Sequence, residues 1–396
     1  MKNAIYLDYN ATTPCDPRVV EKMLPFFAEW YGNPATGLHL QGRKAARAVN
    51  EAREHVAALI NCRPGELIFT AGATESNNLS ILGLGRAHRH GERKRIVTSA
   101  IEHKAVLLPY QKLQEEGYEL IVLPVDPQGR VSVDEAEAAI NDQTLLVSVQ
   151  AANNEVGALQ PIAEIAKIAH AHGAIVHCDA AQAVGKIPVD LAAEAWQVDL
   201  LSISAHKLYG PKGVGALYVR SGPRTLILEP LQYGGGQERG LRPGTTNVPG
   251  IVGFGEACRI CSIELAQESI RIANLRDRFE QALLAGIPGL KINAREALRL
   301  PNTSSLTFPD IDADALLLNL PEVMMGTGAA CSSGALEPSH VLTAMGLSRA
   351  EARSTVRVSL GRFTTLADVE RACSLIVNVL TILEASQSKM PTLKSP

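Results

Sequence analysis

The sequence has no long apolar run, no excess of charge of one sign and no cysteine spacing typical of a disulfide framework. None of its apolar segments approaches the ~18 residues of a membrane-spanning helix, and Asp8 interrupts the stretch where a signal peptide would need apolar residues. Lys+Arg 38 against Asp+Glu 41 leaves a formal net charge of −3, which provides no overall positive field for a polyanion. We therefore expect neither a membrane nor a direct nucleic-acid partner.

The seven cysteines are odd in number and widely scattered. This distribution is typical of thiols in a reducing compartment and predicts a cytoplasmic location. Cys258 and Cys261 form a single CxxC within a predicted helix, and no second ligand pair accompanies them. An incomplete set of this kind does not indicate a metal site.

What is present is the composition of an ordinary folded enzyme, with 46% hydrophobic and 20% charged residues over 396 positions. Apolar residues at three- and four-residue spacings predict a helix over 45–60, and another long helix is expected over about 253–284. Short apolar strands alternate with helical segments in the order ELIFT, RIVTSA, ELIVLPV, TLLVSVQAA, AIVHCDAAQ, DLLSISA and VGALYV. This alternation predicts a largely parallel sheet.

The remainder predicts a second, smaller unit. LKINA, SSLTFP and STVRVSL are expected to be strands, and DVERACSLIVNVLTILEA a helix. Between the two units, the glycine- and proline-rich segment 229–250 predicts an ordered loop or a boundary. The fold class is therefore α/β, with a large domain built on a mainly parallel mixed sheet flanked by helices, plus a smaller α+β domain.

Polar residues follow two of the predicted strands, where open parallel sheets place ligands. Asp179 ends one strand, and Ser204, His206 and Lys207 end the next, before a Gly/Pro turn. An amine desolvated in such a place can attack a carbonyl. Together with the turn into a predicted helix at Ala73 and Thr74, these groups fit pyridoxal phosphate, which needs a lysine, a carboxylate and a phosphate cradle. The residues alone leave a helix cap at Asp179 and a surface role for Lys207 open.

Ten motifs, in order, resemble the NifS-like cysteine desulfurases, which share the class V aminotransferase fold. They are LDYNATTP, GNPATGLHLQG, FTAGATESNN, IEHKAV, NNEVGALQP, HCDAAQAVGK, SISAHKLYGPKGVG, GGGQERGLRPGTTN, GAACSSGALEPS and VRVSLGRFTT. They extend from about Tyr6 to Thr365, nearly the whole chain. The resemblance implies a pyridoxal phosphate enzyme that converts L-cysteine to L-alanine.

The resemblance also implies the residues around the cofactor ring. Lys207 in SAHK is similar to the lysine that binds the cofactor as a Schiff base, and Asp179 in DAAQ to the partner of the pyridinium nitrogen. Gln182 resembles the residue that bonds the ring hydroxyl. His103 in EHK resembles the histidine that stacks on the ring and acts as acid and base.

For the cofactor phosphate, the resemblance implies a composite site. The cradle residues correspond to Ala73, Thr74, Ser204 and His206. Thr245 is similar to a residue that reaches the phosphate from the other subunit, which implies a homodimer. The division implied for the chain is 14–258 for the large domain, and 1–13 with 259–396 for the small one.

For the substrate and the sulfur, the matching residues are Asn154 in NNEVG, which the resemblance also places at the cofactor, Arg357 in VRVSLGR and Cys331 in GTGAACSSG. A planar guanidinium suits an amino-acid carboxylate. Cys331 lies among glycines in a segment, about 324–336, that predicts a mobile loop, so its thiolate could carry sulfur as a persulfide to acceptor proteins. By itself, a lone cysteine is as consistent with a small buried residue. The physiological acceptor stays open among iron–sulfur cluster assembly, tRNA or cofactor thiolation, and DNA phosphorothioation.

Two other kinds of reaction compete with this reading. An aminotransferase or a selenocysteine lyase of the same fold would keep the cofactor, and an aminotransferase would need no thiol at Cys331. A metal-dependent hydrolase would use His170, His172, His177 and Asp179, but two histidines two positions apart on a helix point to different faces. A nucleotide site at Gly185 and Lys186 lacks the flanking residues of a P-loop.

Overall fold

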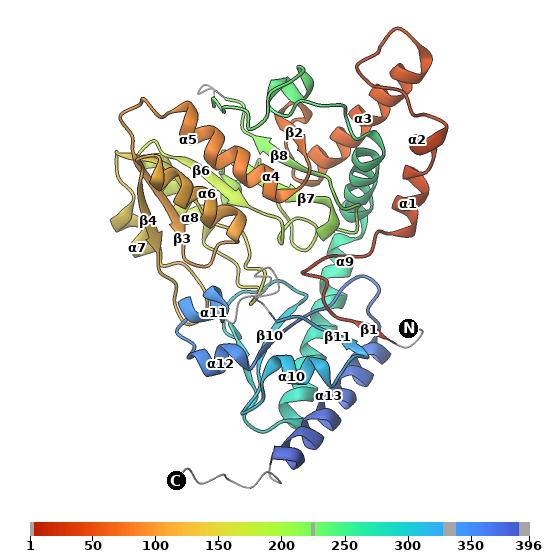
Figure 1. The fold of residues 1–396 in the computed structure, drawn as a ribbon, viewed down its shortest axis with the longest axis vertical. Helices are drawn as coiled ribbons and strands as arrows, with labels where there is room; N and C mark the ends of the chain where they lie inside the picture. The colour runs from red at the N-terminus through yellow and green to blue at the C-terminus, as the bar shows by residue number, and fades with distance from the viewer. Residues whose placement is uncertain (1–3, 223–225, 328–337, 388–396) are drawn as a thin grey trace, which may run out of the picture.

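The computed structural model describes residues 4–222, 226–327 and 338–387. Its central element is a seven-stranded sheet of order β2-β8-β7-β6-β5-β3-β4, which lies in the upper part of the molecule in Figure 1. The strands are β2 (Leu67–Thr70), β3 (Arg95–Ser99), β4 (Glu119–Leu123), β5 (Thr144–Ser148), β6 (Ile175–Asp179), β7 (Leu200–Ser204) and β8 (Gly215–Val219). Only β8 runs against its neighbours, β2 and β7, while β4, β3, β5, β6 and β7 are parallel. Each predicted strand of the large unit and its mainly parallel arrangement are confirmed.

Alternate side chains of this sheet pack into two different apolar clusters. On one face, Phe69, Val147 and Val176 pack with the helices α3, α7, α8 and α9. On the other face, Ile68 and Leu146 pack with the segment from α4 to α6. Because both faces are covered, the strands are apolar along their whole length, as in buried parallel sheets.

The helices of this part of the chain are mostly short. They are α1 (Pro17–Met23), α2 (Pro25–Ala28), α3 (Leu40–Leu59), α4 (Ala73–Asn78), α5 (Leu84–Ala87), α6 (Lys104–Glu115), α7 (Val133–Ala139) and α8 (Ile162–Ala171), with the single-turn elements η1 (Pro64–Glu66), η2 (Leu79–Gly83), η3 (Glu194–Trp196), η4 (Ala205–Lys207) and η5 (Gln237–Gly240). The η2 turn is π-helical and joins α4 directly to α5. The buried stripe of α3 at Ala45, Val49, Ala52 and Val56 has the predicted helical spacing.

The helix α9 (Val248–Gly286) is 39 residues long and passes from the upper to the lower part of the molecule in Figure 1. It begins five residues before the predicted start, because Pro249 sits in its first turn, where a missing N–H costs nothing. The side chain of Asn247 caps this end by accepting from the N–H of Gly250 at 3.1 Å. At Gly255 an added Cβ would meet Cα of Ala52 at 2.5 Å, so a glycine is what lets α3 lie against α9.

The lower part holds a three-stranded antiparallel sheet of order β12-β10-β9. Its elements are β9 (Lys291–Asn293), β10 (Thr303–Thr307), α10 (Ala313–Leu318), β11 (Val323–Met324), α11 (His340–Ala344), α12 (Arg349–Arg353), β12 (Thr355–Ser359) and α13 (Leu366–Gln387). The N-terminal strand β1 (Ile5–Tyr6) pairs with β11 in parallel. The three strands and the final helix predicted here are confirmed.

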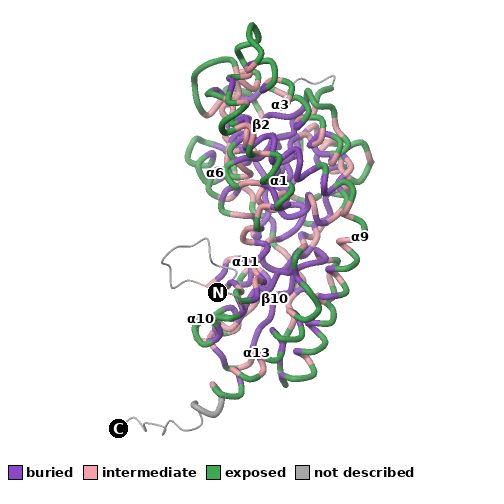
Figure 2. Tube along the Cα trace, turned by 90° about the vertical axis from the view of Figure 1, so that its right-hand side faces the viewer, coloured by how far each residue is buried: buried purple, intermediate pink, exposed green. Residues whose placement is uncertain are grey.

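Figure 2 shows buried chain in both the upper and the lower part of the molecule, whereas residues 262–271 in the middle of α9 are not buried. The first half of α9 contributes to the core of the large sheet, whereas Ile272, Leu275 and Phe279 belong to a separate apolar cluster with β10, β12 and α13. The exact division at 13/14 and 258/259 stays a prediction. Among the described residues, no helix is long and apolar enough to cross a membrane.

Candidate active site

A cavity of about 1060 Å³ opens at the carboxyl edge of the seven-stranded sheet. Its walls come from the segments that follow β2, β3, β5, β6 and β7, from residues 10–12 and from β12. The predicted site residues that line it are Ala73, Thr74, His103, Asn154, Asp179, Gln182, Ser204, His206, Lys207 and Arg357. Residues from both parts of the chain therefore meet at one place, the edge where parallel sheets bind ligands.

Two predicted residues stand apart from this set. Thr245 is exposed, between η5 and α9, and does not line the cavity of its own chain. Its expected contact with the phosphate in another subunit stays a prediction. Cys331 lies outside the described residues, and so does most of the loop expected over about 324–336.

The carboxylate of Asp179, at the end of β6, is held by one donor on each oxygen. Nδ2 of Asn77 donates to Oδ2 at 2.7 Å, and the N–H of Ala181 donates to Oδ1 at 2.9 Å. Asn77 comes from α4 and is almost completely buried. Asn77 stands in the motif FTAGATESNN but is not among the predicted site residues. Because both oxygens are hydrogen-bonded, the carboxylate has a fixed orientation. A carboxylate that is to bind a ring nitrogen needs such an orientation.

The start of α4 provides the groups expected of a phosphate cradle. Within the described part of the chain no side chain caps this helix end, and its N-cap residue Gly72 has φ +148°, which favours glycine. At Gly215 an added Cβ would lie 2.7 Å from Cα of Gly72, so β8 also approaches this turn closely. Free backbone N–H groups at a helix start suit an anion.

His206 lies at the same end of the cavity. Its Nδ1 is 3.1 Å from Oγ1 of Thr12. Burial, reinforced by the positive charge of Lys207, lowers the pKa of His206 to about 4. At neutral pH it is therefore a neutral hydrogen-bonding group rather than a second cation.

Lys207 is half-buried in η4, immediately after β7. Its Nζ donates to the backbone carbonyls of Asn10 and Ala11, the latter at 2.8 Å. The N-terminal segment thus holds the amine inside the cavity, which the strand pattern alone did not indicate. Lys207, Asp179 and the cradle near Gly72 together fit the amine, carboxylate and phosphate requirements of pyridoxal phosphate.

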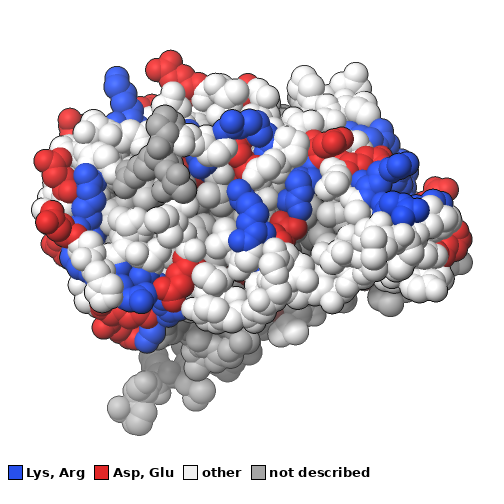
Figure 3. All heavy atoms as spheres, turned by 90° about the horizontal axis from the view of Figure 1, so that it is seen from above, with Lys and Arg blue, Asp and Glu red and all other residues white. Residues whose placement is uncertain are grey.

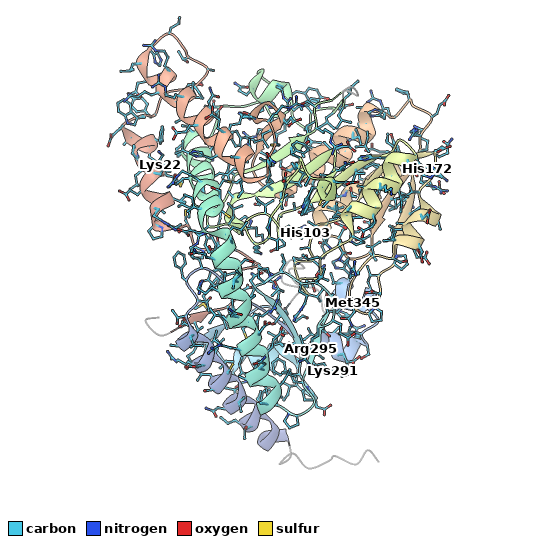
Figure 4. All side chains as sticks on the ribbon, turned by 180° about the vertical axis from the view of Figure 1, so that it is seen from behind. Lys22, His103, His172, Lys291, Arg295 and Met345 are labelled. Atoms are coloured by element: carbon cyan, nitrogen blue, oxygen red, sulfur yellow. The ribbon has the colours of Figure 1, made fainter. Side chains whose placement is uncertain are left out.

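His103 is the N-cap residue of α6, where its Nδ1 accepts from the N–H of Ala105 at 3.0 Å. In a neutral ring this contact leaves the proton on Nε2. His103 lies near the middle of the molecule, between the large sheet and the lower part (Figure 4). Its ring is therefore fixed in place on the cavity wall.

Arg357, on β12, is the lower part's contribution to the cavity. Its Nη2 donates to Oδ1 of Asp8 at 2.7 Å and its Nη1 to the backbone carbonyl of Asn154 at 3.2 Å. The Nε atom is buried without a hydrogen-bond partner among the described residues. The guanidinium therefore already has a carboxylate partner within the chain.

The histidines of the competing metal-site hypothesis have other partners. His170 lies 2.9 Å from Asp199, His172 lies 2.7 Å from Asp142, and the buried His177 is bonded to the hydroxyls of Ser148 and Ser202. No group of three or more metal-ligating side chains gathers within 4–222, 226–327 and 338–387. On the face shown in Figure 3, basic and acidic side chains are interspersed.

Comparison with known proteins places these features in a family. The model of the family "Aminotransferase class-V" matches residues 5–372. The mitochondrial cysteine desulfurase of Arthroderma benhamiae is 47% identical over 380 residues, which cover 96% of this chain and 75% of that protein. The solved structure of a NifS-like protein matches with TM-score 0.88 and 38% identity, over 96% of this chain and all of that one. The structure of SspA in complex with cysteine matches with TM-score 0.79 and 37% identity, over 91% and 100%. The chain therefore belongs to the class-V aminotransferase family, among its cysteine desulfurases.

Proposed function

We propose that this protein is a pyridoxal phosphate-dependent cysteine desulfurase, which converts L-cysteine to L-alanine and transfers the sulfur as a persulfide on Cys331. The observation that carries the proposal is the convergence of Lys207, Asp179 and Arg357 on one cavity. An amine, a carboxylate and a guanidinium are the groups that a cofactor aldehyde, a ring nitrogen and an amino-acid carboxylate require. The 47% identity to a protein named cysteine desulfurase supports the reaction.

When bound, the cofactor supplies an electron sink for bonds at the amino acid's α and β carbons. The chain supplies its binding groups. Lys207 holds the aldehyde carbon, Asp179 the ring nitrogen and Gln182 the ring hydroxyl. The residues assigned to the phosphate are Ala73, Thr74, Ser204 and His206.

Arg357 and Asn154 bind and orient the substrate. The guanidinium binds the cysteine carboxylate in place of the carboxylate of Asp8, to which Nη2 donates at 2.7 Å. Because the Arg357 side chain is 5% exposed, water screens this contact little. The amine of Lys207 and the ring of His103, both on the cavity wall, are the groups that take and return protons.

The sulfur step needs a nucleophile that the described residues do not include. In the proposal, the thiolate of Cys331 attacks the sulfur of the bound cysteine, so an S–S bond forms as the C–S bond breaks. The electron pair of the broken bond stays on the carbon, which gains a proton to complete alanine. The resulting persulfide passes its outer sulfur to an acceptor protein.

We also infer a homodimer in a reducing compartment, with cytoplasm as the expected location. Thr245 is exposed in its own chain, in keeping with a role in a neighbouring cavity. Large exposed side chains gather between α1 and α3, at Leu24, Phe27, Tyr31 and Leu38, and such a surface is typical of an interface.

The test replaces the proposed sulfur carrier. Cys331→Ser is expected to keep the visible absorbance of the cofactor but to reduce alanine formation from cysteine by more than about 100-fold. Cys62→Ser is the matched control, since burial raises the pKa of the Cys62 thiol to about 12 and it therefore stays protonated. Alanine formation retained in Cys331→Ser would contradict the proposal.

A further inference from the structure

Behind the cavity wall lies a buried lysine that the proposed reaction does not use. Lys186, four residues after Gln182, is 9% exposed. Its Nζ donates to Oδ1 of Asn10 at 2.9 Å and to Oε1 of Gln182. Both acceptors are neutral amides, and in the part of the chain that the structure describes Lys186 has no carboxylate partner. Burying an ammonium without a counter-ion is costly, so packing alone does not explain this residue.

The hydrogen bond to Lys186 fixes the orientation of Gln182. An ammonium can only donate, so while Lys186 is protonated the side-chain oxygen of Gln182 faces it. The amide nitrogen then faces the other way, where it donates to the backbone carbonyl of Asn10 at 3.0 Å. Since Gln182 lines the cavity, its remaining N–H is the group it can offer to a ligand there. Lys186 thus makes Gln182 a hydrogen-bond donor toward the cavity.

Asn10 also links Lys186 to Lys207. The side-chain oxygen of Asn10 accepts from Lys186, and its backbone oxygen accepts from Lys207. Two amines therefore bind the two oxygens of one residue in a buried setting. Burial, followed by the positive charges of Lys207 and Arg357, lowers the pKa of Lys186 well below its usual value. Such coupling is mutual, because a proton on either amine disfavours a proton on the other.

The other charged and titratable groups around Lys186 do not compensate for its charge. His206 is neutral, as described above, and Tyr9, Tyr209 and Glu268 line a narrow cavity that Lys186 shares with Lys207. The pKa of Tyr209 is raised by burial, so it carries no charge at neutral pH. The carboxylate of Glu268 is paired with Arg362 at 2.9 Å.

We propose that Lys186 is a positioning residue for the cofactor: its bond to Oε1 turns the amide N–H of Gln182 toward the ring hydroxyl, and in its protonated form it lowers the proton affinity of the Lys207 nitrogen that binds the cofactor. The inference rests on the proposed function, because it assumes that Lys207 binds pyridoxal phosphate. A deprotonated nitrogen at this position can accept a proton from an incoming amino acid, which favours its reaction near neutral pH.

The test uses Lys186→Met and Lys186→Gln, with Lys167→Met on the exposed face of α8 as the control. In the holoenzyme, the pH midpoint of the visible cofactor absorbance is expected to rise by about one unit in both Lys186 variants, because both lose the charge. The dissociation constant for pyridoxal phosphate is expected to rise about tenfold in Lys186→Met, and less in Lys186→Gln, which keeps a donor.

A purely structural role for Lys186 would lower thermal stability without moving the pH midpoint. Midpoints equal to that of the unsubstituted protein in either folded variant would overturn the proposal. If Lys186→Met does not fold, Lys186→Gln decides the charge effect alone. Absence of any visible absorbance with pyridoxal phosphate in the unsubstituted protein would instead contradict the proposed function itself, and this inference with it.

Discussion

The two walls of the cavity differ in how their polar groups are held. On the wall formed by Asn77, Asp179 and Lys207, here called the cofactor wall, each functional group has its orientation set by a neighbour that need not move, such as Asn77 on Asp179. On the wall formed by Asp8 and Arg357, here called the substrate wall, the guanidinium is bonded to a carboxylate of the chain itself. Under the proposed function, the cofactor wall holds its groups in place for the ligand, whereas the substrate wall must exchange one carboxylate for another.

This difference suits the two ligands. A cofactor that stays bound profits from groups already in position, since no side chain has to be ordered when it binds. A substrate that must enter and leave profits from an arginine that is never left as an unpaired buried charge. In the proposed reaction, Asp8 would keep Arg357 paired between turnovers. If the two walls act independently, a substitution on one wall should leave ligand binding at the other unchanged.

The largest effect is expected from the cofactor wall, with Lys207→Ala. Loss of the amine removes the only covalent attachment proposed for the cofactor, so the visible absorbance should disappear and activity should fall by about 1000-fold or more. Absorbance spectroscopy and an alanine assay measure both effects. Lys212→Ala, which removes an exposed lysine from the same cavity, is the comparison. An unchanged absorbance spectrum in Lys207→Ala would refute the assignment.

On the substrate wall, Arg357→Gln should act without touching the cofactor. Removing a charged, two-pronged contact with a carboxylate is expected to raise KM for cysteine about 100-fold. The visible absorbance should stay as it is. Steady-state kinetics test this, with Arg353→Gln on α12 as a control for the loss of an exposed charge. A weakened cofactor affinity in Arg357→Gln would mean that the two walls are not independent.

A smaller effect is expected from Asn77→Ala, which removes the donor to Oδ2 of Asp179. Leaving one carboxylate oxygen of Asp179 without its partner should weaken pyridoxal phosphate binding about tenfold. KM for cysteine should change little, because the side-chain nitrogen of Asn77 bonds Asp179 and, among the described residues, has no hydrogen bond with Arg357. Asn78→Ala is a suitable control, since among the described residues Nδ2 of Asn78 bonds the carbonyl of Thr74 in its own helix. Equal affinities in the two variants would show that the Asn77 contact is dispensable.

The smallest effect on activity is expected at Glu102, just before His103. Burial raises the pKa of Glu102 to about 8, so the folded protein keeps this carboxyl protonated where the unfolded chain would ionise it. Glu102 therefore destabilises the fold increasingly as the pH rises from about 4.5 to about 8. Glu102→Gln should remove this pH-dependent destabilisation. At pH 8 the free energy of unfolding should increase by on the order of 3 kcal/mol, less the cost of an unpaired amide N–H.

Urea unfolding at pH 5 and pH 8 measures the Glu102 effect. The stability advantage of Glu102→Gln should be larger at pH 8 than at pH 5. Advantages of equal size at the two pH values would mean that Glu102 does not titrate in this range. Glu115→Gln, at an exposed position of α6, provides the baseline.

The fold could be predicted well, and for a physical reason. Strands buried on both faces are apolar throughout, so segments such as AIVHCDAAQ stand out without knowledge of their neighbours. The helix α9 begins before its predicted start, because a proline is tolerated in the first turn of a helix and Pro249 does not mark a loop. Helix ends depend on capping contacts such as that of Asn247, which composition does not reveal.

The site could be predicted in part. Residues at strand ends, such as Asp179 and Lys207, follow from the local pattern and from the resemblance to the desulfurases. The supporting contacts of Asp8 and Asn10 could not, since Asp8 is 349 positions from Arg357 and Asn10 is 176 positions from Lys186. These pairs exist only once the N-terminal segment has folded onto both parts of the chain. The motif LDYNATTP marked the segment but not its role.

The central claim is that Lys207 binds the cofactor in this cavity. The most direct measurement is to treat the protein loaded with pyridoxal phosphate with borohydride, which fixes the cofactor on its lysine, and to locate the modified peptide by mass spectrometry. The account predicts the pyridoxyl group on Lys207. Modification on Lys186 or Lys212 instead, or no modified lysine in a protein that shows the visible absorbance, would contradict it.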